Sequence, residues 1–141
     1  MRSPNSFDWI EQDVVLAIHE AQITEHGGSL GVRDLGLLQS ALSRPKNAAA
    51  YGQPDVPELA ALYALGIIKN HPFIDGNKRV GAVLLETFLE LHRYELLADD
   101  DELFQTIVAI AGGKLSEDGF KEWVRSRSSA SPRRRSSRRT K

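Results

Sequence analysis

Apolar residues along most of the chain recur three and four positions apart, the spacing that places side chains on one face of an α-helix. The first such stretch covers residues 10–23 and predicts an amphipathic helix that ends before Gly27 and Gly28. A second helix is predicted from about residue 33 to residue 42, because the residue before Pro45 disfavours helical backbone. Residues 44–56 contain prolines and little periodicity, and they are predicted to form a loop.

Four further helices follow along the chain. Asp55 is suited to cap a third helix, which is predicted to continue to about residue 70. A fourth helix is predicted over residues 77–92, and its long apolar run places it at the centre of the fold. Two shorter helices are predicted at about 101–111 and 116–125, and no segment shows a convincing strand pattern. The predicted fold class is therefore all-α, a compact bundle of about six helices around a buried central helix.

The length and composition narrow the possible classes of protein. The 141 residues suit one domain, which we place at residues 1–125. The absence of cysteine excludes disulfides, thiolate metal sites and a cysteine nucleophile. Uncharged central stretches such as residues 59–68 fall well short of the ~20 residues needed to span a bilayer. The N-terminal sequence reaches Asp8 before any apolar run, unlike a signal peptide, so we expect a cytoplasmic protein without membrane contact.

The formal net charge of −1 conceals an uneven distribution along the chain. Residues 1–124 carry a net charge of −9, whereas residues 125–141 carry +8. An acidic body repels phosphates at long range, so a nucleotide binds only where local dipoles and cations reverse the field. Residues 126–141 are almost entirely Ser and Arg, which predicts a disordered basic tail. The tail has the charge for nucleic-acid contact, and a solvated tail is the simpler interpretation.

A polar segment separates the third and fourth predicted helices. Residues 71–79 read His-Pro-Phe-Ile-Asp-Gly-Asn-Lys-Arg. Gly76 and Asn77 open the fourth helix, whose first amides lack internal partners and carry the positive end of the helix dipole. Lys78 and Arg79 add two cations at the same place. The segment therefore predicts an anion-binding turn, with phosphate as the natural ligand.

Three other side chains in the same segment carry candidate chemistry. Asp75 next to a phosphate is repulsive unless a divalent cation such as Mg²⁺ bridges the oxygens, so it is a candidate metal ligand or helix cap. His71 is suited to act as a general base near neutral pH, and Phe73 is a candidate apolar anchor for the loop. Singly, each has an ordinary structural interpretation, as do polar residues elsewhere in the chain, namely His19, His26, Arg33, Asp34 and His92. The occurrence of these side chains and the two cations together in residues 71–79 favours a functional site.

This loop resembles the signature of the Fic/Doc superfamily, which has the form His-Pro-Phe-x-Asp-Gly-Asn followed by Gly-Arg or Lys-Arg. The resemblance covers roughly residues 13–124 and is greatest to the death-on-curing (Doc) branch, in the segments 27–38, 63–67 and 94–96. It implies an all-α Fic fold. For Doc toxins it further implies Mg²⁺-dependent transfer of a phosphate from ATP to a threonine of elongation factor Tu, which halts translation.

The same resemblance implies a role for each residue of the loop. His71 would be the general base, Asp75 the acidic residue that serves the metal or the target hydroxyl, and Arg79 a third catalytic residue on the phosphates. Phe73 would anchor the loop. The residues that would form the nucleotide-binding and phosphate-binding turn are Gly76, Asn77, Lys78 and Arg79.

Departures from the family pattern separate two possible reactions. Adenylylating members typically read Gly-Asn-Gly-Arg-x-x-Arg, whereas here Lys78 replaces the second glycine and Ala82 stands in place of the last arginine. The bulky side chain of Lys78 restricts how closely the inner phosphates of a nucleotide can approach the backbone. The missing arginine removes one of their partners. Phosphate transfer is therefore favoured over AMP transfer. An AMP transferase, and a catalytically idle module that binds nucleic acid through its tail, are the alternative hypotheses.

The sequence also bears on how such an enzyme would be restrained. Self-restrained Fic proteins resemble one another in carrying an inhibitory helix with Ser/Thr-x-x-x-Glu, and no Ser or Thr of this chain is followed four residues later by Glu. The resemblance instead implies a separate Phd-like antitoxin, whose disordered C-terminal segment folds as a helix into a groove of the toxin. The acidic body favours a segment that bears cations or apolar anchors.

Overall fold

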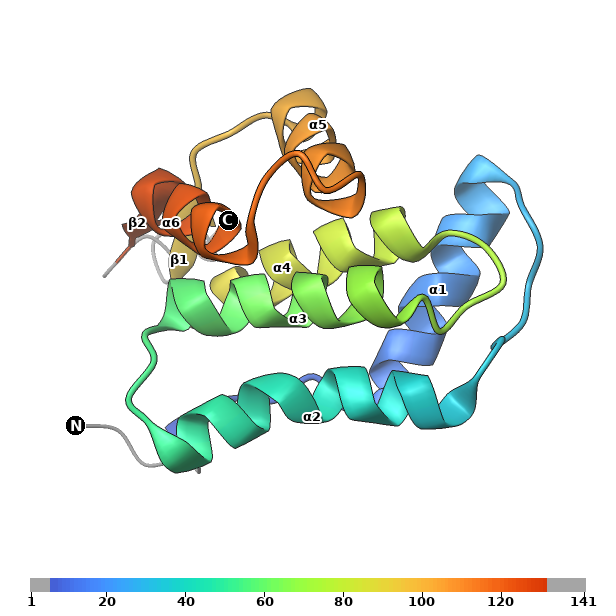
Figure 1. Ribbon diagram of the computed structural model, residues 1–141, viewed down its shortest axis with the longest axis horizontal. Coiled ribbons are helices and arrows are strands. Elements are labelled where there is room, and N and C mark those ends of the chain that lie inside the picture. Colours follow the sequence, from blue (N-terminus) through green and yellow to red (C-terminus); the bar gives the residue numbers. More distant parts are fainter. Residues whose placement is uncertain (1–5, 132–141) are drawn as a thin grey trace, which may run out of the picture.

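A computed structural model of the protein describes residues 6–131, which contain six helices and one small sheet (Figure 1). The helices are α1 (Gln12–His26), α2 (Leu35–Tyr51), α3 (Val56–Asn70), α4 (Asn77–Leu91), α5 (Asp100–Ala111) and α6 (Glu117–Arg127). The strands are β1 (Tyr94–Leu96) and β2 (Ser128–Ala130). The predicted all-α class and helical bundle are confirmed. Within the described residues no helix has both the length and the apolar character to cross a membrane.

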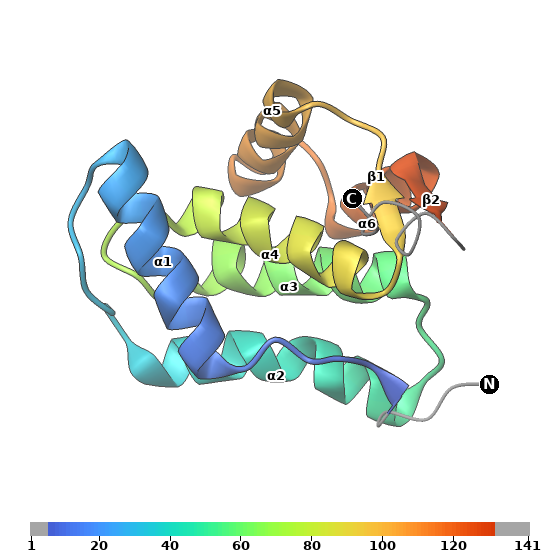
Figure 2. The same cartoon turned by 180° about the vertical axis from the view of Figure 1, so that it is seen from behind.

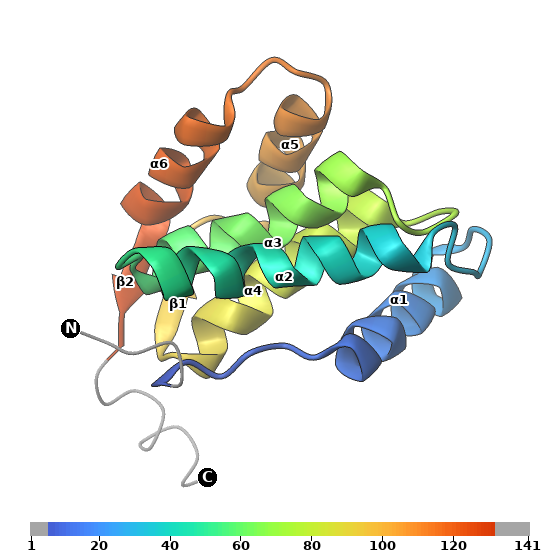
Figure 3. The ribbon, with the colours of Figure 1, turned by 60° about the horizontal axis from the view of Figure 1, so that its bottom comes forward.

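The core of the bundle lies around α3 and α4, which run side by side (Figure 1). In α3 every residue from Val56 to Ile67 except Glu58 is buried, so this helix contacts neighbours on all sides. In α4 one face is buried, while Ala82 and Val83 are only half-buried. Helix α2 covers one side of α3 and α6 covers another, while α5 packs against α4 and α1 crosses α4 from behind (Figures 2 and 3). The most central helix is therefore α3 and not the fourth helix, as its apolar run predicted, although α4 lies directly beside α3.

Helix α2 continues through Pro45 to Tyr51, so the predicted end at residue 42 and the predicted loop over 44–56 are wrong. Proline removes the donor that would bond the carbonyl of Ala41. Gly66 of α3 packs at this point, since a Cβ on Gly66 would lie 2.9 Å from the Ala41 oxygen. Close packing of the two helices, with Pro45 buried between its neighbours, overrides the local preference of proline.

The two strands were not predicted, and they change the boundary of the domain. Strand β2 pairs antiparallel with β1, with Tyr94 opposite Ala130. The N–H of Ser131 donates to the carbonyl of Arg93 at 2.7 Å, and Ser131 is buried. The expectation of a disordered tail is therefore wrong for residues 126–131, because α6 continues to Arg127 and backbone pairing holds residues 128–131. The rest of the expected tail, and with it the alternative of nucleic-acid contact, lies outside the described residues.

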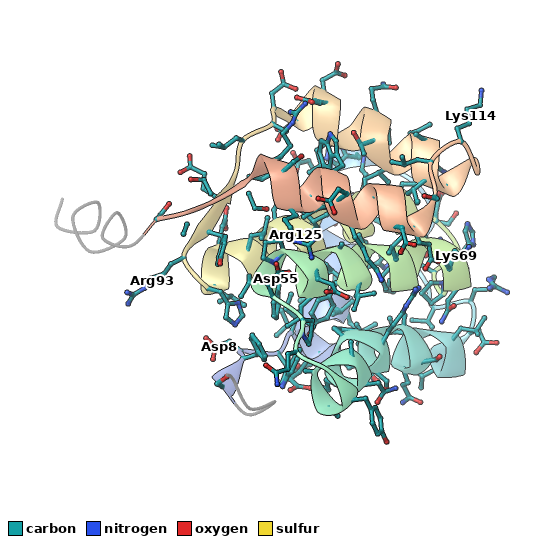
Figure 4. All side chains as sticks on the ribbon, turned by 60° about the vertical axis from the view of Figure 1, so that its left-hand side comes forward. Asp8, Asp55, Lys69, Arg93, Lys114 and Arg125 are labelled. Atoms are coloured by element: carbon teal, nitrogen blue, oxygen red, sulfur yellow. The ribbon has the colours of Figure 1, made fainter. Side chains whose placement is uncertain are left out.

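Ion pairs attach α6 to the helices beneath it. Asp55 caps α3 by accepting the N–H of Glu58 at 3.0 Å, as predicted, and it also binds Arg125 of α6 (Figure 4). Burial alone would raise the pKa of Asp55, but the hydrogen bonds from Arg125 and the Glu58 amide hold it below its usual value. At the other end of α6, Glu117 pairs with Arg44 of α2 and Lys69 of α3.

The close packing at Gly66 predicts that substitution by alanine has opposite effects on stability at two helical glycines. Gly66→Ala is expected to destabilise the protein by about 1–3 kcal/mol, because the new methyl group meets the Ala41 backbone. Gly81→Ala in α4 is expected to stabilise it by about 0.5–1 kcal/mol, because alanine favours helix. Its Cβ would have no neighbour nearer than 3.5 Å. Thermal unfolding of both variants measures the difference, and equal stabilisation would show that the α2–α3 crossing is not tight.

Candidate active site

The segment that joins α3 to α4 turns sharply at both ends. His71 ends α3 in the left-handed conformation, with φ of 52°, and its N–H donates to the carbonyl of Ile67 at 3.0 Å. Gly76 precedes α4, also in the left-handed conformation, with φ of 82°. Such backbone is costly for most residues and natural for glycine. These two turns bring the end of α3 and the start of α4 to the same edge of the bundle.

The side chain of Asn77 closes the loop from within. Its Oδ1 accepts the N–H of Phe73 at 3.0 Å, and its Nδ2 donates to the carbonyl of Phe73 at 2.9 Å. Asn77 is only 4% exposed and Phe73 is fully buried. The Asn77 side chain is therefore committed to holding the loop. Toward a ligand this residue offers its backbone amide alone.

His19 of α1 supports the same loop from below. Its ring stacks on that of Phe73, with 3.9 Å between ring centroids and 8° between ring planes. Its Nε2 donates to the backbone carbonyl of Asp75 at 2.9 Å. We gave His19 an ordinary structural interpretation from the sequence, and its contacts with two residues of the loop were missed. The available signal was its place on the buried stripe of α1, four residues from both Val15 and Ile23.

The segment between α1 and α2 runs alongside the loop, as Figures 1 and 3 show. Val32 forms an isolated antiparallel bridge with Phe73, and the N–H of Ile74 donates to the carbonyl of Gly31 at 3.1 Å. The N–H of Ser29 donates to Oδ2 of Asp75 at 3.2 Å. Gly28 is required there, since a Cβ would lie 2.8 Å from that oxygen. No pattern in the sequence indicates this pairing.

Arg33 and Asp34 act at the ends of two helices. The Arg33 guanidinium donates from Nε to the carbonyl of His71 at 2.8 Å and from Nη2 to that of Asn70 at 2.9 Å. It thereby satisfies terminal carbonyls of α3 that lack partners inside the helix. Asp34 caps α2 by accepting the N–H of Leu37 at 3.0 Å. Both residues have a structural role, as the sequence indicated, and Arg33 also fixes the backbone of His71.

The exposed side chains of the loop line one pocket of about 220 Å³. His71 and Asp75 enter it from the loop, Lys78 and Arg79 from the first turn of α4, and Phe104 from α5. The backbone amides of the first turn of α4 have no partner within that helix and point outward. Cations, helix dipole and free amides together make this pocket suited to an anion, in spite of the acidic body.

A metal ion at this pocket would depend on Asp75. Its Oδ1 accepts the N–H of Gly76 at 3.0 Å and its Oδ2 that of Ser29, which leaves lone pairs on both oxygens. Among residues 6–131, no three His, Asp or Glu side chains converge as a metal cluster. The residues present therefore fit Mg²⁺ that is bound by one carboxylate together with phosphate oxygens and water, the usual arrangement for this ion.

A second hollow of about 340 Å³ lies beside the first, between α1, α4 and α5. Arg79 and Phe104 line both pockets. We call this hollow the acidic groove, because Glu25, Glu86 and Asp100 line it. Burial, followed by repulsion from Asp100 and Glu90, raises the pKa of Glu86. The groove therefore favours a positively charged occupant.

Residues 9–89 match the family model described as Fic/DOC family. A protein named Toxin Doc from Mycolicibacterium smegmatis is 42% identical over 78 residues, which cover 53% of this chain and 59% of that protein. A protein named Protein kinase doc from Escherichia phage P1 is 28% identical over 117 residues, covering 82% of this chain and 92% of that protein.

The contacts of His19 give a prediction that separates stacking from hydrogen bonding. His19→Ala is expected to destabilise the protein by about 3 kcal/mol, because it leaves a cavity beneath Phe73. His19→Phe keeps a ring in place and removes only the donor to Asp75, so a loss of about 1 kcal/mol is expected. Denaturant unfolding measures both values. Equal losses for the two variants would contradict a supporting role for the stacked ring.

Proposed function

The chain belongs to the Fic/DOC family, and we propose that it is a Doc-like toxin that transfers the γ-phosphate of ATP to a serine or threonine hydroxyl of a translation factor. Elongation factor Tu is the proposed target. The printed names of the two relatives, a toxin and a protein kinase, support this proposal. The observation that carries it is the single pocket that joins His71, Asp75, Lys78 and Arg79 to the first amides of α4.

The proposed reaction assigns each group a step. The amides of α4 with Lys78 and Arg79 hold the phosphate chain and stabilise the charge that develops during transfer. The ring of His71 forms no hydrogen bond or ion pair within the described part of the chain, so a nitrogen is available to accept a proton. It takes the proton of the target hydroxyl as that oxygen bonds to the γ-phosphorus. The bond to the β-phosphate oxygen then breaks, and ADP leaves.

Asp75 is proposed to serve the metal or to orient the target hydroxyl. Mg²⁺, when bound, would neutralise part of the phosphate charge. Hydrogen bonds from Ser29 and Gly76 already fix the orientation of the carboxylate, so little ordering is needed on binding.

The residues around the first turn of α4 favour phosphate transfer over AMP transfer. The exposed Lys78 side chain occupies the position at which adenylylating relatives leave the backbone open. One turn further along, Ala82 supplies no cation and lines the acidic groove. The inner phosphates of a nucleotide would therefore lack the partner that AMP transfer requires.

We propose the acidic groove as the binding site of a Phd-like antitoxin. Its carboxylates attract a cationic segment, while Ala82, Val83 and Leu103 offer apolar contacts. Because Arg79 lines both hollows, a segment bound in the groove would lie directly beside the phosphate pocket. Such an antitoxin would restrain the enzyme from outside the chain.

Intact mass spectrometry of elongation factor Tu after incubation with the protein, ATP and Mg²⁺ tests the proposed function. The expected product carries one added phosphate. His71→Ala is expected to slow its formation by about 10²–10⁴-fold, the usual cost of removing a general base. Lys78→Ala should also slow it, because a phosphate contact is lost.

Lys114→Ala is the matched control for the lysine variant. Lys114 is exposed and extends from the end of α5 away from both hollows, so the rate should be unchanged (Figure 4). Addition of an adenylate in place of a phosphate would mean that the protein is an AMP transferase. A folded His71→Ala variant as fast as the wild type would refute the catalytic role of that residue.

A further inference from the structure

The guanidinium of Arg79 is held by an aromatic ring. Its Cζ lies 5.7 Å from the centroid of the Phe104 ring on α5, within the range of a cation–π interaction. Within residues 6–131 the side chain of Arg79 forms no ion pair and donates no hydrogen bond. The contact with Phe104 therefore favours one orientation of this exposed side chain over its many alternatives.

Phe104 stands between two competing electrostatic environments. On one side is the pocket lined by Lys78 and Asp75, and on the other is the acidic groove with Glu86 and Asp100. A long arginine side chain at the border could pair with a carboxylate of the groove, which would draw its charge away from the phosphate pocket. In the structure it does not, and it lies against the ring instead.

An aromatic ring is suited to holding the Arg79 guanidinium without neutralising its charge. Its negative face attracts a cation without neutralising it, and it accepts none of the five N–H donors of the guanidinium in a strong hydrogen bond. The full charge and the donors thus remain available to a phosphate, whereas a carboxylate partner would occupy both. Because the ring already restricts the side chain, less conformational entropy is lost when the phosphate binds.

We propose that Phe104 is a positioning residue, which holds the guanidinium of Arg79 at the phosphate pocket and away from the carboxylates of the acidic groove. This inference rests on the proposed function, since it concerns how the phosphate of ATP is bound. Phe104 itself is half-buried on the surface of α5 and is not required as a core residue.

A double-mutant cycle with Arg79 tests the proposal. Phe104→Leu keeps an apolar side chain but removes the ring, and it is expected to lower kcat/KM for ATP by about 3–30-fold, the range of cation–π energies from exposed to desolvated sites. Phe104→Tyr is expected to restore the wild-type value. In an Arg79→Ala background, Phe104→Leu should have no further effect, because the group that it positions is gone. An equal fold-loss in both backgrounds would overturn the proposal.

A measurement without ATP tests the contact directly. The Nε–H resonance of Arg79 should carry a ring-current shift in the wild type, lose it in Phe104→Leu and keep it in Phe104→Tyr. A resonance that is identical in all three proteins would overturn the proposal. Should Phe104→Leu unfold, Phe104→Met also removes the ring, and its flexible side chain fills irregular space better.

The matched control is the other cation–π pair of the described chain, in which Arg127 lies 5.5 Å from the ring of Trp123 on α6. Trp123 lines neither hollow, so Trp123→Leu should leave kcat/KM unchanged. An equal loss of kcat/KM in that variant would show that loss of any such ring is sufficient, and would overturn the proposal. Failure of the wild-type protein to transfer phosphate would refute the proposed function instead, and the resonance of Arg79 would still report on the contact.

Discussion

The candidate site depends on the two hydrogen bonds between the side chain of Asn77 and the backbone of Phe73. They close the segment between α3 and α4 into a rigid turn, and they do so inside the protein, where few competing waters can reach. His19 holds the same turn from α1, and Arg33 holds the end of α3. The chemistry of the pocket therefore rests on polar contacts that come from three separate parts of the chain.

Electrostatics explains why this place suits a phosphate on an otherwise acidic body. The dipole of α4 and two adjacent cations reverse the field locally, while the carboxylates of the neighbouring groove lie on the far side of Phe104. The same division gives the two hollows opposite preferences: an anion in one and a cationic segment in the other. Arg79 lines both hollows. A ligand bound in one hollow would therefore affect binding in the other through this residue.

Much of the fold and the site could be predicted because the information is local. Helical periodicity and N-caps such as Asp55 located the helices, and the candidate site residues are contiguous in sequence. The errors arose where distant contacts decide. Pro45 stays helical because α3 packs against it, and β2 forms only because β1, some thirty residues earlier, offers a partner. The contacts of His19 and of the segment before α2 with the loop are likewise long-range: the buried stripe of α1 indicates that His19 faces inward, but no local pattern identifies its partners.

The most direct test of the account is a titration with ATP and Mg²⁺ followed through the backbone amide resonances. The account predicts that the largest shifts fall on Asn77, Lys78 and Arg79, whose amides form the start of α4, and that they saturate together. Shifts concentrated instead on the residues of the acidic groove, with the amides of the first turn of α4 unmoved, would contradict the claim that this turn binds the phosphates.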